Sequence, residues 1–427
     1  MRVKVINRNE EDFTKERSQD LRKVHHNLDP TLHPFEKAHE YGRALNAAKL
    51  DRVFAKPFLA ALPHDDGITC LARSPKVLNS IVSGTADGEI RIWDIPQERC
   101  LRRLMGHTAA VRGISFATDG QSCVSCSTDT TVKLWKVPYA PFESGNVQRD
   151  QQPVFEFHGK SPFRGIDHHW CRTMFATLIQ SPPVRFNPAE PDVFATTGGD
   201  RSLALYDLRS STPVRKLIMQ TRSNAMAWNP MEAFNFTVAN EDCNLYSYDM
   251  RKMSSATCVH QDFVSAVMDV DYSPTGREFV AGAYDRSIRI FAYNGGHSRE
   301  VYTTKRMQRV FCVRFSGDAS YVFSGSDDMN VRVWKAEASQ QLGVLLPQER
   351  HKQAYSKALV ERYKHMPEIK RIVRHRHLPV AIYKAGKTRR AVQDADKRKL
   401  KRRIEHSAPG SVKVKAERKK KIIAELE

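Results

Sequence analysis

Residues Ser83 to Asp94 read S-G-T-A-D-G-E-I-R-I-W-D, and this stretch decides the fold. Ile90 and Ile92 alternate with charged residues, as expected of a strand with one buried face. Trp93 ends the strand, and Asp87 lies six residues before it in a polar turn. The same Asp-to-aromatic unit recurs at Asp129/Trp135, Asp200/Tyr206, Asp242/Tyr248, Asp285/Phe291 and Asp328/Trp334.

The spacing of these units identifies the repeat. From Asp87 to Asp328 the steps are 42, 71, 42, 43 and 43 residues. A period near 42 with a turn Asp and a strand-ending aromatic residue is typical of β-propeller blades. The units resemble the WD-repeat family, whose blades end in Trp-Asp and share a buried network of His, Ser or Thr, Asp and an aromatic residue. The matching His positions are His64, His107 and His260.

The step of 71 residues is too long for one repeat and about 14 short of two. Residues 154–157 and 173–177 read as strands within it, but no Asp-to-aromatic unit precedes Ser181. We therefore expect an all-β, seven-bladed propeller whose third blade is atypical or truncated.

The propeller is predicted to span residues 53–346, after an N-terminal arm (1–52) and before a basic C-terminal domain or tail (347–427). In the arm, residues 29–35 contain two prolines and predict an extended segment, and Glu36 to Leu50 predict a short helix. Residues 53–60 read as a strand, and Pro57 indicates an edge position. The resemblance to WD-repeat propellers implies that this strand completes the last blade, which removes exposed sheet edges. The C-terminal extension is expected to be mainly helical, because Tyr355, Leu359 and Tyr363 follow at helical spacing.

Charge is unevenly distributed along the chain. The net charge is +20, and residues 347–427 hold 25 Lys and Arg against 9 Asp and Glu. A near-neutral propeller with a strongly basic tail indicates a polyanion partner, most often nucleic acid. The eight cysteines are scattered, as is typical of a reducing compartment. No run approaches the ~18 apolar residues of a membrane-spanning helix.

No catalytic constellation is found in the sequence. Phosphate-binding loops, H-E-x-x-H and G-x-S-x-G motifs are absent, so an enzyme, a cofactor and a small-molecule substrate are not predicted. Cys123 and Cys126 form a CxxC without a second pair, which favours a structural role. His168 and His169 are adjacent and point to opposite faces of a strand, so they are not expected to share a metal ion.

The basic tail supports two compatible interpretations. Residues 397–403 read as a nuclear import signal, and the tail as a whole suits salt-sensitive binding of an RNA backbone. The candidate RNA-binding residues are Lys370, Arg371, Arg374, His375, Arg376, His377, Lys387, Arg389, Arg390, Lys397, Arg398, Lys399, Lys401, Arg402 and Arg403.

Two successive repeats carry a Tyr-Asp-x-Arg sequence at their ends. It resembles the Trp-Asp-x-Arg box with which propellers dock on the adaptor of cullin–RING ubiquitin ligases. The simpler alternative is that these residues pair across a blade rim. The candidate docking residues are Asp207, Arg209, Asp249 and Arg251.

Both ends of the chain narrow the family. The chain resembles the WD repeat and SOF domain-containing proteins over essentially its whole length. The segments that carry the resemblance are residues 28–35, 43–47, 49–58, 165–170, 228–234 and 369–383. The departure is the third blade, where relatives carry a further strand ending in Trp-Asp. The resemblance implies a nucleolar scaffold of the small-subunit processome (the 90S pre-ribosome), which uses a box C/D small nucleolar RNA to process the 18S rRNA precursor. Its partners would be these RNAs and other processome proteins, and the rival reading is a substrate receptor of a cullin–RING ligase.

Overall fold

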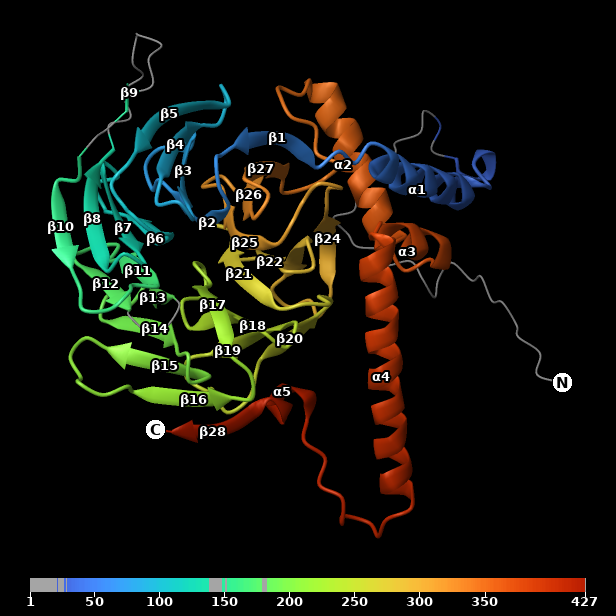
Figure 1. Ribbon diagram of the computed structural model, residues 1–427. Coiled ribbons are helices and arrows are strands. Elements are labelled where there is room, and N and C mark those ends of the chain that lie inside the picture. The colour runs from blue at the N-terminus through green and yellow to red at the C-terminus, as the bar shows by residue number, and fades with distance from the viewer. Residues whose placement is uncertain are drawn as a thin grey trace. The chain divides into compact units, whose positions relative to one another are not determined.

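The computed structural model describes residues 21, 27, 29–137, 148–149, 152–178 and 183–426 of the 427-residue chain. The chain forms two compact units (Figure 1). One comprises residues 58–336 and 378–427 and contains the propeller. The other combines residues 1–57 with residues 337–377 and is helical in its described part.

Six antiparallel sheets of four or more strands form the blades of the propeller (Figure 1). The first two are β2 (Ile68–Arg73), β3 (Ser80–Thr85), β4 (Ile90–Asp94), β5 (Arg99–Leu104) with the short parallel β9 (Gln148–Arg149), and β6 (Val111–Phe116), β7 (Ser122–Ser127), β8 (Thr131–Lys136), β10 (Phe155–His158). The next two are β13 (Val184–Phe186), β14 (Val193–Thr197), β15 (Ser202–Asp207), β16 (Arg215–Met219), β28 (Ile422–Leu426), and β17 (Ser223–Trp228), β18 (Asn235–Asn240), β19 (Asn244–Asp249), β20 (Cys258–Gln261). The last two are β21 (Val267–Tyr272), β22 (Glu278–Ala283), β23 (Ile288–Ala292), β24 (Ser298–Tyr302), and β25 (Val310–Phe315), β26 (Tyr321–Ser326), β27 (Asn330–Lys335), β1 (Phe58–Pro63).

The expected seventh blade is not confirmed. Between β10 and β13 the described residues form only a two-stranded sheet, β11 (Gly165–His168) and β12 (Phe175–Leu178). The strand expected near residues 154–157 is β10, which pairs with β8 as the outer strand of the second blade. Because β10 completes that blade, too little chain remains in the 71-residue step for another four strands.

The first strand closes the propeller as predicted. β1 pairs antiparallel with β27, with Ala60 opposite Val333 and Leu62 opposite Val331. It begins at Phe58 rather than Val53, because the preceding helix continues to Val53 and Pro57 lies between the two elements. This pairing covers the outer edge of the last blade.

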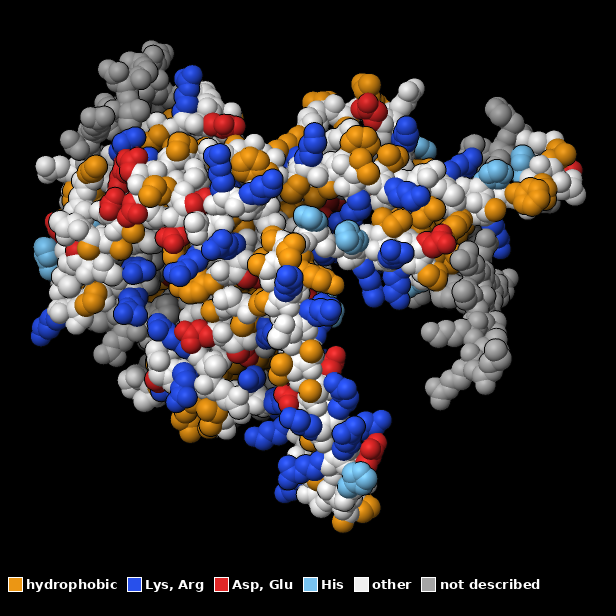
Figure 2. Space-filling model, turned by 45° about the vertical axis from the view of Figure 1, so that its right-hand side comes forward, with side chains coloured by type: hydrophobic (Ala, Val, Ile, Leu, Met, Phe, Trp, Pro, Cys, Tyr) orange, Lys and Arg blue, Asp and Glu red, His pale blue; other side chains and the backbone are white. Residues whose placement is uncertain are grey.

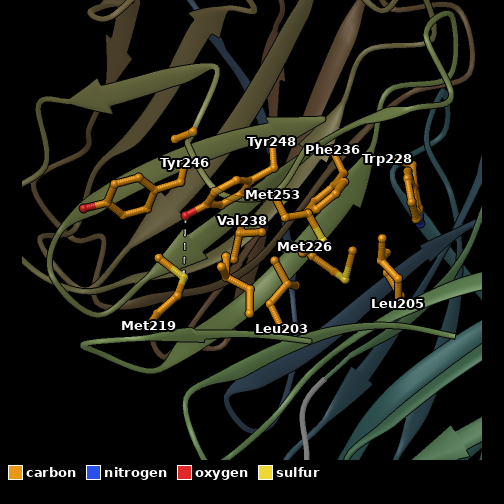
Figure 3. Close-up of a cluster of buried hydrophobic side chains, with 13 residues drawn as sticks. Leu203, Leu205, Met219, Met226, Trp228, Phe236, Val238, Tyr246, Tyr248 and Met253 are labelled. Carbon is orange, nitrogen blue, oxygen red and sulfur yellow. Dashed lines mark hydrogen bonds between the residues drawn. The ribbon is translucent and has the colours of Figure 1, made fainter. Parts of the chain in front are cut away.

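Apolar residues between neighbouring blades form the core. Figure 3 shows one cluster, in which Leu203 and Met219 of one blade face Met226, Phe236 and Tyr248 of the next. The Tyr248 hydroxyl lies 3.9 Å from the Met219 sulfur (Figure 3). Each buried side chain of this size stabilises the fold by about 1.5–3 kcal/mol, so blade-to-blade packing holds the ring together.

The repeated Asp marks a turn of fixed backbone geometry. In all six repeats the next residue has a positive φ, and only the first repeat places a glycine there. The six residues are Gly88, Thr130, Arg201, Cys243, Arg286 and Met329. The left-handed conformation disfavours residues with a Cβ, so the turn is held against a local strain.

The helical unit combines the N-terminal arm with the segment that follows the last blade. Its described elements are a 3-10 turn (Pro30–Leu32), α1 (Glu36–Val53), α2 (Pro347–Arg362) and α3 (Pro367–Arg374). Ala44 and Ala48 of α1 pack against Leu359, Tyr363 and nearby residues of the C-terminal part. The predicted helix in the arm is confirmed, whereas the segment 29–35, expected to be extended, contains a 3-10 turn. Leu359 and Tyr363, which follow at helical spacing, both lie in this core.

Two further helices belong to the propeller unit. α4 spans Val380–Glu405 and none of its residues is buried. It ends before residues 407–411, which include a Ser-Ala-Pro-Gly sequence. The short α5 (Glu417–Lys420) then leads into β28.

Candidate nucleic-acid interface

The histidines and hydroxyl residues of the repeats hold the blades together. In the second blade, His107 Nε2 lies 2.7 Å from Ser125 Oγ, its Nδ1 lies 2.8 Å from an Asp129 oxygen, and Trp135 Nε1 donates to Ser125 Oγ at 2.8 Å. This is the four-residue network expected from the repeat. In the first blade His64 binds Ser83 at 2.6 Å, but the turn Asp is exposed. Of these two blades, the second therefore has the complete network, because there the turn Asp contacts the His.

A cavity of about 260 Å³ lies where the inner strands of the blades meet. Its charged groups face one another across neighbouring strands. Arg314 lies 3.8 Å from Asp271, and Arg185 lies 3.4 Å from Asp167. Asp167 and Asp271 also accept backbone N–H groups of the adjacent inner strand. These ion pairs link neighbouring inner strands, and Arg73, which also lines the cavity, donates to the Phe315 carbonyl at 3.1 Å.

The cysteine and histidine pairs are structural. Cys123 and Cys126 are free and buried in β7, and burial raises the pKa of the Cys123 thiol to about 12, which makes it unreactive. His169 is buried, its Nδ1 accepts the N–H of Cys171 at 2.9 Å, and its Nε2 donates to the Pro191 carbonyl. Within the described ranges, no group of three or more His, Cys, Asp or Glu could hold a metal ion.

The first part of the basic set belongs to the helical unit. Lys370, Arg371 and Arg374 lie on α3, which buries Ile369 and exposes these three charges. His375 and His377 are exposed beyond it. The Arg376 guanidinium donates to the carbonyl of Val373 at 2.6 Å and closes the turn after the helix. The exposed residues form a small cationic surface at the end of α3.

The second part lies on α4 of the propeller unit, which positions the remaining residues. Figure 2 shows Lys and Arg side chains gathered along the part of this helix that runs toward its C-terminal end. Among the candidate residues on α4, Arg389 is half-buried and the others are exposed. The exposed positions of α4 are Lys387, Arg390, Lys397, Arg398, Lys399, Lys401, Arg402 and Arg403.

Arg389, one of the predicted RNA-binding residues, contacts the propeller instead of being free for RNA. Its guanidinium donates to the carbonyls of Phe263 and Asp242, the latter at 2.9 Å, and to Asn244 Oδ1 at 3.1 Å. A guanidinium with three acceptors on the propeller has little left to offer a phosphate. Arg389 therefore anchors α4, and its neighbours remain the candidates for RNA contact.

The two Tyr-Asp-x-Arg sequences form matching turns after β15 and β19. Asp207 Oδ1 accepts the N–H of Arg209 at 3.0 Å, and Asp249 Oδ1 accepts the N–H of Arg251 at 2.9 Å. The Arg209 side chain is 77% exposed and pairs with Asp192. The Arg251 guanidinium lies 3.9 Å from the centre of the Phe234 ring. Neither Arg pairs with the Asp of its own turn, so the simple rim pair is not what these residues form.

Sequence reasoning missed two features of the tail, the anchoring role of Arg389 and the strand β28. The apolar pair Ile422-Ile423 after four basic residues was the available signal for a strand. Such a pair at the end of a charged segment is too short to distinguish a strand from a helix by periodicity.

The comparisons with known proteins fit this architecture. A family model described as Sof1-like domain matches residues 336–422, and models of the WD domain, G-beta repeat match residues 57–94, 98–136, 255–291 and 297–335. "DDB1- and CUL4-associated factor 13" of Xenopus laevis is 48% identical over 450 aligned positions, which cover 100% of both chains. "Protein SOF1" of Saccharomyces cerevisiae is 43% identical over 90% of this chain and 87% of its own. The chain belongs to the Sof1-like family of WD-repeat proteins.

Structural similarity supports the fold of this Sof1-like protein. The crystal structure of the WD40 β-propeller domain of Doa1 aligns with a TM-score of 0.55 at 14% identity, over 65% of this chain and 96% of that chain. At that identity the likeness concerns the fold alone. The matched families are WD-repeat and Sof1-like, and neither is a catalytic family. No helix in the described part of the chain is long and apolar enough to cross a membrane.

Proposed function

We propose that this Sof1-like protein is a non-catalytic nucleolar scaffold of the small-subunit processome. It would act in 18S pre-rRNA processing together with the box C/D small nucleolar ribonucleoprotein. The observation that carries the proposal is α4, a long helix without a buried residue that exposes Lys and Arg along its C-terminal half. Such a helix has no core function, and its charge suits a phosphate backbone.

In this mechanism the propeller would bind proteins and the basic helix α4 would bind RNA. The propeller supplies rigid blades and loops on which other processome proteins dock. Each Lys or Arg of α4 that neutralises a phosphate releases a counterion, which makes binding strong, salt-dependent and largely independent of sequence. The protein would thereby hold RNA at a defined place without reading its bases.

The test neutralises three exposed residues on one face of α4, with Lys399, Arg402 and Arg403 changed to Gln. Crosslinking to RNA in cells is then compared with the wild-type protein. The matched control changes Lys37, Arg43 and Lys49, which are exposed on α1, to Gln and removes the same charge. We expect crosslinks to 18S precursor or small nucleolar RNA to fall several-fold for the α4 variant alone. Equal crosslinking of all three proteins would contradict RNA binding by α4.

A second proposed function is docking on a cullin–RING ligase adaptor. The observation that favours it is the pair of matching turns with exposed Arg209 and Arg251 in successive blades. The names of several relatives, which are called DDB1- and CUL4-associated factor 13, point in the same direction. The docked protein would present a substrate to the ligase.

The two functions can be separated by one double variant. Arg209→Ala with Arg251→Ala should abolish co-purification with DDB1, while 18S rRNA maturation continues, if the ligase role is separate. Retained DDB1 binding in the double variant would show that these turns are not the docking site. The absence of DDB1 from the wild-type protein's complexes would remove the ligase proposal altogether.

A further inference from the structure

The end of the chain adds a strand to a blade. β28 lies antiparallel to β16, with Leu426 opposite Lys216, Glu425 opposite Leu217 and Ala424 opposite Ile218. Figure 1 shows it at the outer edge of the β13–β16 blade. The Sof1-like family model ends at residue 422, so four of the five residues of this strand lie beyond it.

Contacts made just before β28, and by its first residue, help to hold it in place. The N–H of Gln220 donates to the Lys421 carbonyl at 3.0 Å, and the N–H of Ala256 donates to the Arg418 carbonyl at 3.1 Å. Ile422 packs against the apolar cluster drawn in Figure 3. The attachment therefore combines main-chain hydrogen bonds of strand addition with one apolar anchor.

The same tail is attached a second time at Arg389. Between Arg389 and α5, residues 390–416 carry nine Lys and Arg against three Asp and Glu. Apart from three intermediate positions on α4 and two in the loop that follows, their side chains are exposed. The most basic part of the propeller unit is thus a segment attached at both of its ends.

We propose that β28 is a latch that positions the basic segment 390–416 for an RNA backbone. This inference rests on the proposed RNA binding and adds a positioning element to it. A segment attached at both ends samples fewer conformations than a free tail, so less entropy is lost when it binds RNA. The latch raises affinity without touching the RNA, and the number of neutralised phosphates is the same with the latch open or closed.

The alternative is that β28 only covers the edge of its blade. Uncovered edges promote aggregation, so edge protection is a sufficient reason for a strand to bind there. The two roles differ in their effect on RNA affinity. A protective strand leaves affinity unchanged when it is removed, provided that the propeller stays folded.

The first experiment uses a chain that ends at Lys421. This deletion removes Glu425 and Glu427 and therefore raises the net charge by two. Charge alone predicts equal or tighter binding, whereas the latch predicts weaker binding. The probe is a fluorescent 30-nucleotide single-stranded RNA of mixed sequence, titrated by anisotropy at several salt concentrations. We expect a loss of affinity of at least about fivefold with an unchanged slope of log K against log salt.

A matched pair of substitutions controls for folding and charge. Ile422→Asp disrupts the apolar anchor, whereas Ile423→Asp adds the same charge at a position that is 56% exposed. We expect the first variant to bind RNA more weakly than the second. Trypsin should also cut the segment 390–421 faster in the Ile422 variant without RNA, while the thermal transition of the propeller remains.

A reversible lock gives the opposite change in the same protein. Lys216→Cys with Leu426→Cys, in a background with Cys171→Ser, places two thiols on residues opposite each other in the strand pair. Oxidation should slow RNA dissociation relative to the reduced form. Equal RNA affinity of the wild-type, deletion and Ile422 variants would overturn the latch and leave RNA binding intact. If the wild-type protein shows no salt-dependent RNA binding, the proposed function itself fails.

Discussion

At the scale of single residues, the repeated turn stores strain that a glycine would relieve. Met329 has a φ of 64° and its side chain is 46% exposed. Met329→Gly removes the Cβ that the left-handed region disfavours, and we expect stabilisation by up to about 1 kcal/mol. Urea unfolding followed by tryptophan fluorescence measures it. Asp327→Gly, at a nearby exposed position without a positive φ, should destabilise, and the same sign for both variants would contradict the strain argument.

The buried histidines make stability depend on pH. His260 is fully buried, and burial lowers its pKa to about 4. Below its ordinary value near 6.5 the unfolded chain takes up a proton that the folded chain refuses until about pH 4, so stability falls as the pH drops through this window. We expect about 2 kcal/mol of this loss between pH 7 and pH 5 from His260.

The measurement is the free energy of unfolding in urea at pH 7 and pH 5. His260→Asn should shrink the difference between the two values by about 2 kcal/mol, although the variant is less stable at both. His64, whose pKa is also lowered to about 4 by burial, should retain its share of the effect. If the variant keeps the full pH dependence, His260 takes up its proton as readily in the folded protein as in the unfolded chain, which would contradict the prediction.

At the scale of elements, a buried ion pair joins α1 to α2. Glu40 and Arg362 are each 7% exposed, their charged groups lie 2.9 Å apart, and the Tyr363 hydroxyl also reaches Glu40. Arg362→Ala leaves a buried carboxylate without its cation, which costs about 3–5 kcal/mol. We expect hydrogen exchange to accelerate in α1 and α2.

Lys364→Ala is the control for this prediction. Its ion pair with Glu361 is exposed, and such pairs contribute at most about 1 kcal/mol. The control should leave exchange in α1 nearly unchanged. If both variants accelerate hydrogen exchange equally, any loss of positive charge on this segment destabilises the helices. The buried ion pair would then make no specific contribution.

At the scale of the whole molecule, the stability of the propeller depends on ring closure by β1. Leu62 of β1 is fully buried in a cluster with Ile68, Phe323 and Val331. Leu62→Ala should lower the free energy of unfolding by about 2–5 kcal/mol, because it leaves a cavity at the joint. Leu78→Ala, at a position 58% exposed, is the matched control and should change little. Similar losses for the two variants would argue against closure at this strand.

Much of this protein follows from local patterns in its sequence. The Asp-to-aromatic spacing predicted the blades, and the matching His and Ser positions predicted networks such as that of His107 and Ser125. The resemblance to WD-repeat propellers predicted the closing strand, and helical spacing predicted the core of the helical unit. These features are readable because neighbouring residues set both the period and the turn chemistry.

Only the tertiary structure decided which distant segments meet. Arg389 finds its acceptor on Asn244 across 145 residues, and Arg362 finds Glu40 across 322. β28 could pair with any open edge, and the register of β16 and the apolar cluster beneath Ile422 select one. Among the described residues, the sheet of β11 and β12 has two strands, because β10 is paired in the preceding blade. The identity of a charged or apolar residue does not predict its partner, because the interaction energy depends on the distance in space and not on the separation along the chain.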